Sequence, residues 1–510
     1  MLMLYPSKSS FLNIRPLRAA AASTIRSHAR PSSSSAYNLK PAPQHDTLPP
    51  SRPPPSFPCV AQHTARQSRI LLQRASQSQS PNPSSSGPEP PYARPSPSTY
   101  KTYHHTKPLP LTYAEPLPEL DIAYETWGTL SPARDNVILV HTGLSASSHA
   151  ASTLENPAPG WWEKFIGPGR ALDTRRFFVI CTNVLGGCYG STGPSSIEPA
   201  TGKPYATNFP VISIFDMVRA QYALLDHLGI EKLYASVGSS MGAMQSLAAG
   251  WMFPERVGKV VSISGTARSS PSSIAMRFAQ RSGKYSFILM ADPNWNGGFY
   301  YDHIPPHTGL KLARQIATIT YRSGPEWDIR FGRQVQASSE PGEQRTPVLC
   351  PDFLIETYLD HQASPRLCPL IGEQFCLKYD ANSLLYVSKA MDLFDMTEPS
   401  LVALGLSPAT PTPPPTKPAQ GRVHPPPANP APHLPALAAG LRPLAHTPIL
   451  ILGVQSDILF PVEQQRELAD ALRMTGNSRV SYYELGGVWG HDTFLLDEQN
   501  VGGAIRGFLD

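Results

Sequence analysis

The chain lacks several features that would assign it to a class of proteins at once. Of its 510 residues six are cysteine, without a C-x-x-C pair or the spacing of zinc ligands. No apolar run approaches the ~18 residues that a membrane-spanning helix needs. Lys and Arg number 43 against 38 Asp and Glu, a balance that does not favour nucleic acid as a partner. We therefore expect mostly free thiols in a reducing compartment, no metal site, no membrane segment and no nucleic-acid partner.

The first hundred residues differ in composition from the rest. Residues 1–45 contain no acidic residue, several arginines and lysines, and much serine and alanine. This composition is typical of a mitochondrial transit peptide, so we predict one at 1–45 and a mitochondrial location. A disordered tail on a cytoplasmic protein, or an over-long gene prediction, is the alternative. The segment 46–99 is rich in proline and serine, cannot bury a core, and is predicted to be disordered.

From about Tyr100, short apolar runs alternate with segments of helical periodicity, of which Ile214 to Leu228 ends at Gly229. This alternation predicts an α/β fold with a mostly parallel, doubly wound sheet. The predicted strands are 122–127, 137–140, 177–181, 233–237, 260–263, 449–453 and 480–483. The predicted domain parts are a core at 100–266 and 444–510, interrupted by a helical lid at 267–443 that contains a proline-rich insertion at 407–435.

The most informative segment reads Gly238-Ser239-Ser240-Met241-Gly242. It follows an apolar run and precedes residues at helical spacing, which is the strand–turn–helix setting of a G-x-S-x-G nucleophile turn. Small residues beside the tip allow a tight backbone turn that exposes the serine hydroxyl. We therefore predict Ser240 as a nucleophile and the backbone N–H of Met241 as one donor of an oxyanion hole.

A serine nucleophile needs a base, and the base needs an acid that orients it. In this kind of fold the order along the chain is Ser, Asp or Glu, and then His. Asp457 follows the strand at 449–453 and His491 follows the strand at 480–483, so both fall where active-site loops converge. We predict His491 as the base, Asp457 as its orienting acid, and the N–H of Leu144 as the second oxyanion donor.

At this point the chain resembles the homoserine/serine O-acyltransferase branch of the α/β-hydrolases, from about Leu111 to Asp510. The motifs that carry the resemblance are NVLGGCYGSTGPSS (183–196), VGSSMG (237–242), DPNWNGG (292–298), GLKLARQIATITYRS (309–323), RFGR (330–333), YDANSLLYVSKAMD (379–392), SDILFP (456–461) and GHDTFLL (490–496). The resemblance implies an α/β-hydrolase fold and acyl transfer from acyl-CoA to a hydroxyl amino acid through an acyl-serine. Acyl-CoA is then a co-substrate and no cofactor is expected. Members of the family are commonly dimers, which implies a homodimer.

The resemblance also assigns substrate-binding residues. Arg314 and Tyr321 match positions that hold the amino acid, and Asp492 matches the carboxylate that holds its ammonium group. TGLSASSHA (142–150), NPAPGWWE (156–163) and YRSGPEWDIRFGR (321–333) are similar to the serine-acylating subgroup. In its succinyl-CoA users an arginine occupies the position of Arg277, where it can pair with the free carboxylate of succinyl.

The expected activity is therefore serine O-succinyl or O-acetyl transfer for cysteine synthesis. Homoserine O-acetyl transfer for methionine synthesis, ester hydrolysis, and a non-catalytic binding or assembly role are the alternatives. One extra methylene changes binding by only about 1–3 kcal/mol, so mixed specificity for serine and homoserine is plausible on chemical grounds. Residues 283–287 are an insertion relative to the family and lie close to Arg277 in the sequence.

Overall fold

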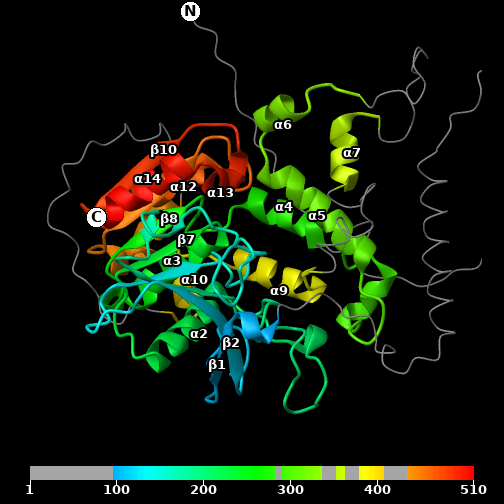
Figure 1. Ribbon diagram of the computed structural model, residues 1–510, viewed down its shortest axis with the longest axis horizontal. Coiled ribbons are helices and arrows are strands. Elements are labelled where there is room, and N and C mark those ends of the chain that lie inside the picture. The colour runs from blue at the N-terminus through cyan, green and yellow to red at the C-terminus, as the bar shows by residue number, and fades with distance from the viewer. Residues whose placement is uncertain (1–95, 282–288, 336–351, 362–377, 407–432) are drawn as a thin grey trace, which may run out of the picture. The chain divides into compact units, whose positions relative to one another are not determined.

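The centre of the structure is an eight-stranded sheet in the order β1-β2-β6-β3-β7-β8-β9-β10 (Figure 1). β1 and β2 pair antiparallel, as do β2 and β6, and the other neighbouring strands are parallel. The mostly parallel sheet predicted from the sequence is thus confirmed. The strands are β1 (Lys101–His105), β2 (Leu120–Trp127), β3 (Val137–His141), β6 (Phe178–Thr182), β7 (Ala235–Ser239), β8 (Val260–Ile263), β9 (Ile449–Val454) and β10 (Val480–Leu485), with a separate pair of β4 (Ile166–Gly167) and β5 (Leu172–Asp173).

The computed structural model describes residues 96–281, 289–335, 352–361, 378–406 and 433–510. All of them belong to one of the two units into which the chain divides, 56–510. The predicted transit peptide, the insertion at 283–287 and most of the segments 46–99 and 407–435 lie outside the described residues. The first described turn, η1 (Pro97–Thr99), falls within the last four residues of the segment predicted to be disordered.

Most predicted strands agree with the structure to within two residues. The strand before the G-x-S-x-G segment begins at Ala235, two residues later than predicted, because Leu233 makes only an isolated bridge to Val257. β1 was not predicted. It is an edge strand whose residues are half-buried or exposed, so its sequence contains no apolar run.

Two apolar layers cover the two faces of the sheet. Along β3, Val137 and Leu139 pack in one layer with α2 and α3, whereas Ile138 and Val140 pack in the other with α14. Alternate residues of a strand point to opposite faces, so a strand buried on both faces is apolar throughout. The helices of the core are α2 (Ile214–His227), α3 (Met241–Met252), α12 (Val462–Met474), α13 (Thr493–Leu496) and α14 (Glu498–Leu509), with the short turns η2 (Ala206–Asn208), η3 (Pro254–Arg256) and η6 (Gly490–Asp492).

The ends of α2 follow from local sequence. Ser213 and Asp216 form a capping box at its first turn, in which each side chain accepts a hydrogen bond from the other residue's backbone N–H. Gly229, with φ of 65°, follows the last turn. The predicted end of this helix at Gly229 is confirmed.

The described residues between β8 and β9 are mostly helical. α4 and α5 lie side by side (Figure 1), and α5 contacts the turn η6, which contains His491. α10 and α11 instead complete the core, since Leu401, Leu434 and Leu437 join the apolar layer of α2 and α3. The elements of the insertion are α4 (Pro271–Arg281), η4 (Pro293–Gly298), α5 (His307–Tyr321), α6 (Gly324–Arg330), α7 (Leu354–His361), α9 (Ala381–Asp392), α10 (Glu398–Ala403), α11 (Leu434–Gly440) and η5 (Arg442–Leu444).

Two cysteines fall within the described residues. Cys181 and Cys188 are both buried and form no disulfide with another described cysteine, whereas the other four cysteines lie outside the described residues. In the part of the chain that the structure describes, no helix combines the length and apolar character needed to cross a membrane.

Candidate active site

The turn between β7 and α3 carries Ser240 at the carboxyl edge of the sheet. Ser240 has φ of 58° and ψ of −126°, a strained backbone conformation for a residue with a side chain. A Cβ on Gly238 would lie 2.0 Å from the carbonyl oxygen of Gly242, and a Cβ on Gly242 would lie 2.3 Å from that of His141. Both glycines of the G-x-S-x-G segment are therefore required by close backbone contacts around the serine.

Ser240, His491 and Asp457 form a continuous chain of hydrogen bonds. His491 Nε2 lies 2.8 Å from Ser240 Oγ, and His491 Nδ1 lies 2.7 Å from Asp457 Oδ2. A carboxylate can only accept, so Nδ1–H donates to Asp457 and Nε2 is left to accept the serine proton. The arrangement can remove that proton as the hydroxyl oxygen attacks an acyl carbon. The three residues come from three different strand ends and meet as expected from chain order.

The surroundings of the triad hold the acid and the base in place. Asp457 is 3% exposed, and its Oδ1 accepts the backbone N–H groups of Leu459 and Phe460, each at 2.9 Å. The ring of Phe460 stacks on His491 with the centroids 5.1 Å apart. Fixed hydrogen bonds and ring packing restrict the imidazole to one orientation, which a general base requires.

The two predicted oxyanion donors lie on adjoining segments. Met241 is the first residue of α3, where helix N–H groups lack partners within the helix. Leu144 lies in the loop after β3, and this loop contacts the start of α3, because the side chain of Gln245 donates to the carbonyl oxygen of Thr142 at 3.0 Å. Backbone amides at such a helix start can stabilise developing negative charge.

The residues expected to hold the amino acid gather where α5 meets the loop of His491. The guanidinium of Arg314 lies 5.4 Å from the centroid of the Tyr321 ring. A Cβ on Gly490 would lie 2.8 Å from the carbonyl oxygen of Tyr321, so the two segments are in close contact. Burial raises the pKa of Asp492, while the charges of His491, Arg322 and Arg314 oppose this shift.

Arg322 belongs to this group and was not predicted. Its Nη2 lies 4.0 Å from Asp492 Oδ2, and its guanidinium lies 5.6 Å from the Tyr321 centroid. Glu326, which is fully buried, pairs with Arg322 and with Arg330. Glu326 and Arg330 are four residues apart on α6 and share one face of that helix, whereas Arg322 lies in the extended link before it. The four-residue spacing was therefore a signal for the pair of Glu326 and Arg330 and not for Arg322.

Arg277 lies in a buried ionic cluster beside the triad. Its Nε donates to Asp392 Oδ1 at 2.6 Å, its Nη2 donates to Ser269 Oγ at 2.9 Å, and Arg281 pairs with the same carboxylate. Its Nη1 is buried and has no hydrogen-bond partner among the described residues. Burial lowers the pKa of Arg277, and Asp392 opposes this shift.

The Arg277 guanidinium is also 6.0 Å from the centroid of Phe460, the ring that stacks on His491. The structure therefore places Arg277 one aromatic ring away from the catalytic base. The roles of Asp392 and Ser269 as its partners were not predicted. Asp392 is 115 residues away from Arg277 in the chain, and Ser269 lies before the helix that carries Arg277. No local sequence pattern identifies either of them as its partner.

His141 is a further buried titratable group near the loop of Leu144. Burial lowers its pKa to about 3, and its Nε2 lies 2.7 Å from Ser236 Oγ. It is thus a neutral histidine within the sheet. No group of three or more His, Cys, Asp or Glu side chains in the described ranges is arranged to hold a metal ion.

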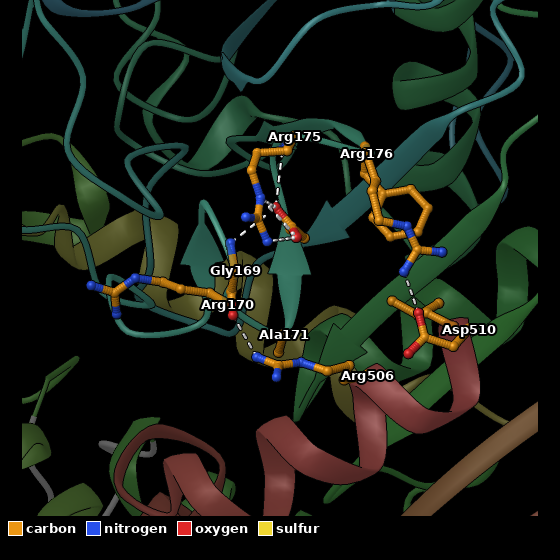
Figure 2. A pocket seen from close by; sticks show the side chains of 10 residues that line it. Gly169, Arg170, Ala171, Arg175, Arg176, Arg506 and Asp510 are labelled. Carbon is orange, nitrogen blue, oxygen red and sulfur yellow. Dashed lines mark hydrogen bonds and ion pairs between the residues drawn. The ribbon is translucent and has the colours of Figure 1, made fainter.

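A small basic pocket of about 200 Å³ (Figure 2) lies at the amino-terminal ends of the strands, where Phe177 precedes β6. Three of its arginines are engaged within the protein: Arg175 pairs with Asp173, Arg176 pairs with Asp510, and Arg506 donates to the carbonyl oxygen of Gly169. The pocket adjoins the end of α14, whose last carbonyl oxygens accept from Lys259 at the start of β8. It is therefore separate from the triad, which lies at the carboxyl ends of the strands.

Comparison with known proteins places the chain among enzymes. The family described as alpha/beta hydrolase fold matches residues 136–497. A serine O-succinyltransferase of Emericella nidulans is 56% identical, over 90% of this chain and 88% of the relative. A solved homoserine O-acetyltransferase from Bacillus anthracis is 26% identical with a TM-score of 0.64, over 81% of this chain and 98% of that one. Esterase E22 is 28% identical with a TM-score of 0.62, over 81% of this chain and 100% of that one. The chain therefore belongs to the α/β-hydrolase fold family and, within it, to the homoserine/serine O-acyltransferases.

Proposed function

We propose that the chain is an L-serine O-succinyltransferase that moves a succinyl group from succinyl-CoA to the serine hydroxyl. The observation that carries the chemistry is the hydrogen-bonded chain from Ser240 through His491 to Asp457. The choice of substrates is supported by the 56% identity with the relative named serine O-succinyltransferase.

The first half-reaction acylates the enzyme. Ser240 Oγ attacks the thioester carbonyl carbon while His491 takes its proton, and the N–H groups of Met241 and Leu144 stabilise the oxyanion. Collapse of the tetrahedral intermediate breaks the carbon–sulfur bond, and the proton held by His491 passes to the departing thiolate. The products are succinyl-Ser240 and free CoA.

The second half-reaction transfers the succinyl group to L-serine. His491 removes the proton of the serine hydroxyl, whose oxygen attacks the acyl carbon, and the proton returns to Ser240 as the ester bond breaks. Arg314 holds the carboxylate of the amino acid, Tyr321 lines its site, and Asp492 holds its ammonium group. Acyl-CoA is a co-substrate in this scheme, and no resident cofactor takes part.

The donor preference is assigned to Arg277. Its buried Nη1 is without a partner among the described residues, and its other nitrogens are held by Asp392 and Ser269. A carboxylate at the end of the succinyl chain would supply the missing acceptor, whereas acetyl has none. A buried N–H group left without a hydrogen-bond partner costs about 1–3 kcal/mol. This cost favours succinyl-CoA, whose terminal carboxylate can accept the hydrogen bond, over acetyl-CoA.

Two alternatives have specific support. The structural likeness to a homoserine O-acetyltransferase favours transfer to homoserine, and that to esterase E22 favours water as acceptor. Either reaction would use the triad of this chain, so the geometry of Ser240 does not separate them. The acceptor does.

Thiol release from succinyl-CoA and acetyl-CoA tests the proposal, each donor being supplied with L-serine, L-homoserine or no acceptor. We expect sustained release that depends on serine and is faster with succinyl-CoA. Release that depends on homoserine would move the enzyme to the first alternative. Equal release without an acceptor would identify a hydrolase, and no release would contradict catalysis.

The reaction fits cysteine synthesis, because a succinate leaving group replaces a hydroxide that sulfide cannot displace.

We further propose a homodimer, which sedimentation would test, and mitochondrial targeting by residues 1–45, supported by composition alone. Deletion of 1–45 should leave purified activity unchanged and abolish import. An unchanged distribution in cells would contradict the targeting proposal.

A further inference from the structure

A tyrosine of the helical insertion is hydrogen-bonded to the loop of the proposed oxyanion hole. The Tyr379 hydroxyl lies 2.7 Å from the carbonyl oxygen of Leu144. A carbonyl can only accept, so Tyr379 is the donor. Tyr379 is 2% exposed and Leu144 is partly exposed, so the bond is partly shielded from water and is worth more than a fully exposed one. The two residues are 235 positions apart in the chain.

Tyr379 itself is held rigidly. Its ring packs edge-to-face on Tyr189 with the centroids 5.7 Å apart. The next residue, Asp380, is fully buried and caps α9 by accepting from the N–H of Ser383 at 2.8 Å. The same carboxylate accepts the hydroxyl of Tyr300 at 2.6 Å, and burial raises its pKa. The start of α9 is thus tied to the chain before α5.

The hydrogen bond from Tyr379 restrains the carbonyl group of Leu144, which follows the amide that joins Gly143 to Leu144. On the other side, Gln245 of α3 donates to the carbonyl oxygen of Thr142 at 3.0 Å. The N–H of Leu144 therefore lies between two carbonyl groups that are each fixed by a buried side chain. A Cβ on Gly143 would meet no atom within 4 Å among the described residues, so the loop borders open space there.

We infer that Tyr379 is a positioning residue for the oxyanion hole. Its hydroxyl fixes the peptide after Leu144, and Gln245 fixes the peptide before Gly143, so the N–H of Leu144 keeps one direction. An oxyanion donor stabilises the transition state to the extent that its direction is set before reaction. The bond also makes the oxyanion hole depend on the placement of α9. This inference rests on the proposed function, in which Leu144 is a donor.

Tyr379→Phe tests the inference, with Tyr386→Phe as the matched control. Phe keeps the ring packing and removes only the hydroxyl. Tyr386 lies on α9, whose N-terminus follows Tyr379, and its hydroxyl donates to the carbonyl oxygen of Thr207 at 2.8 Å, away from the Leu144 loop. The two variants thus lose the same kind of bond, and only one of them touches the proposed oxyanion hole.

Two rates should be measured for the full chain: formation of the acyl-enzyme from succinyl-CoA without serine, and inactivation of Ser240 by a fluorophosphonate. Loss of an oxyanion donor costs about 100- to 1000-fold, so loss of its support should cost less, about tenfold, in both rates. The KM for each substrate should change little. Tyr386→Phe should match the wild type in both rates, and the two variants should have similar melting temperatures.

Equal rates in the two variants would overturn the inference, as would a change in KM alone. A loss in Tyr379→Phe that follows a much lower melting temperature would show a structural role instead. The fluorophosphonate separates this inference from the proposed function, because it reports on the oxyanion hole whatever the natural acyl group is. If the wild type transfers no succinyl group but Tyr379→Phe still slows the probe, the proposed function fails and the positioning role stands.

Discussion

The core and the helical insertion build their parts of the active site in different ways. In the core, Ser240, Asp457 and His491 each follow a strand of one sheet, so the backbone topology brings them together. In the insertion, Arg277 is oriented by side chains from other segments, an aspartate on α9 and the hydroxyl of Ser269. The difference indicates that the sheet determines where the acyl transfer takes place. In the proposed function, the insertion carries Arg277, Arg314 and Tyr321, which select the donor and the acceptor.

The largest effect is expected in the core. Ser240→Ala removes the nucleophile and should reduce thiol release by about ten-thousand-fold or more, since triad residues act as a unit. The fold should persist, because alanine occupies the same small space. Ser239→Ala removes a neighbouring hydroxyl and should retain activity. Thiol release should be measured for both variants. An active Ser240→Ala variant would contradict the assignment of Ser240 as the nucleophile supplied by the core.

The buried ionic cluster of the insertion should dominate its stability. Asp392 accepts from both Arg277 and Arg281, so Asp392→Asn leaves buried positive charge and should cost about 3–5 kcal/mol of unfolding free energy. The control is Glu463→Gln, which breaks the exposed pair with Arg466 and should cost about 0–1 kcal/mol. Denaturant unfolding of both variants measures the difference. Similar losses of unfolding free energy would show that burial does not determine how much these ion pairs contribute to stability.

Asp492→Asn should separate the two half-reactions. Loss of the negative charge that holds the ammonium group should raise the KM for serine by about 100-fold, the upper end for a charged hydrogen bond. Formation of the acyl-enzyme from succinyl-CoA should stay near the wild-type rate. Rapid mixing with and without serine measures both. An unchanged KM would remove Asp492 from the amino-acid site.

Arg277→Lys should change the choice of donor. Lysine keeps the charge but lacks the planar fork, so we expect the preference for succinyl-CoA over acetyl-CoA to fall by about tenfold. Arg281→Lys is the control, because Arg281 meets the same carboxylate but its hydrogen-bonding nitrogens are satisfied by Asp392 and Ser388. Ratios of kcat/KM for the two donors report the change. Equal shifts in both variants would assign the effect to the cluster as a whole.

The smallest effect concerns pH. Burial raises the pKa of Asp492, so its carboxylate takes up a proton at a higher pH than an exposed aspartate does. As pH falls toward that raised value the negative charge is lost, and the KM for serine should increase by about a few fold. Asp492→Asn carries no titrating group there and should show a flat KM over the same range. A parallel rise in both proteins would trace the effect to another group.

Local patterns explain why much of this was predictable. The small residues around Ser240 and the apolar runs of β3 and β9 are properties of a few consecutive residues, and the order of serine, acid and base follows the order of the strands. The polar edge strand β1 has no such pattern and was missed. Arg322 was also missed, although it adjoins Tyr321, because its role depends on reaching Asp492.

The sequence by itself determined the mostly parallel sheet, the serine turn and the chain positions of the acid and the base. These features depend on backbone geometry and on short continuous apolar runs, which neighbouring positions specify. Only the tertiary structure decided that Asp392 anchors Arg277, that Glu326 lies buried between two arginines, and that Tyr379 reaches the carbonyl of Leu144. These are contacts between side chains whose partners are set by how helices pack, and packing depends on the whole chain at once.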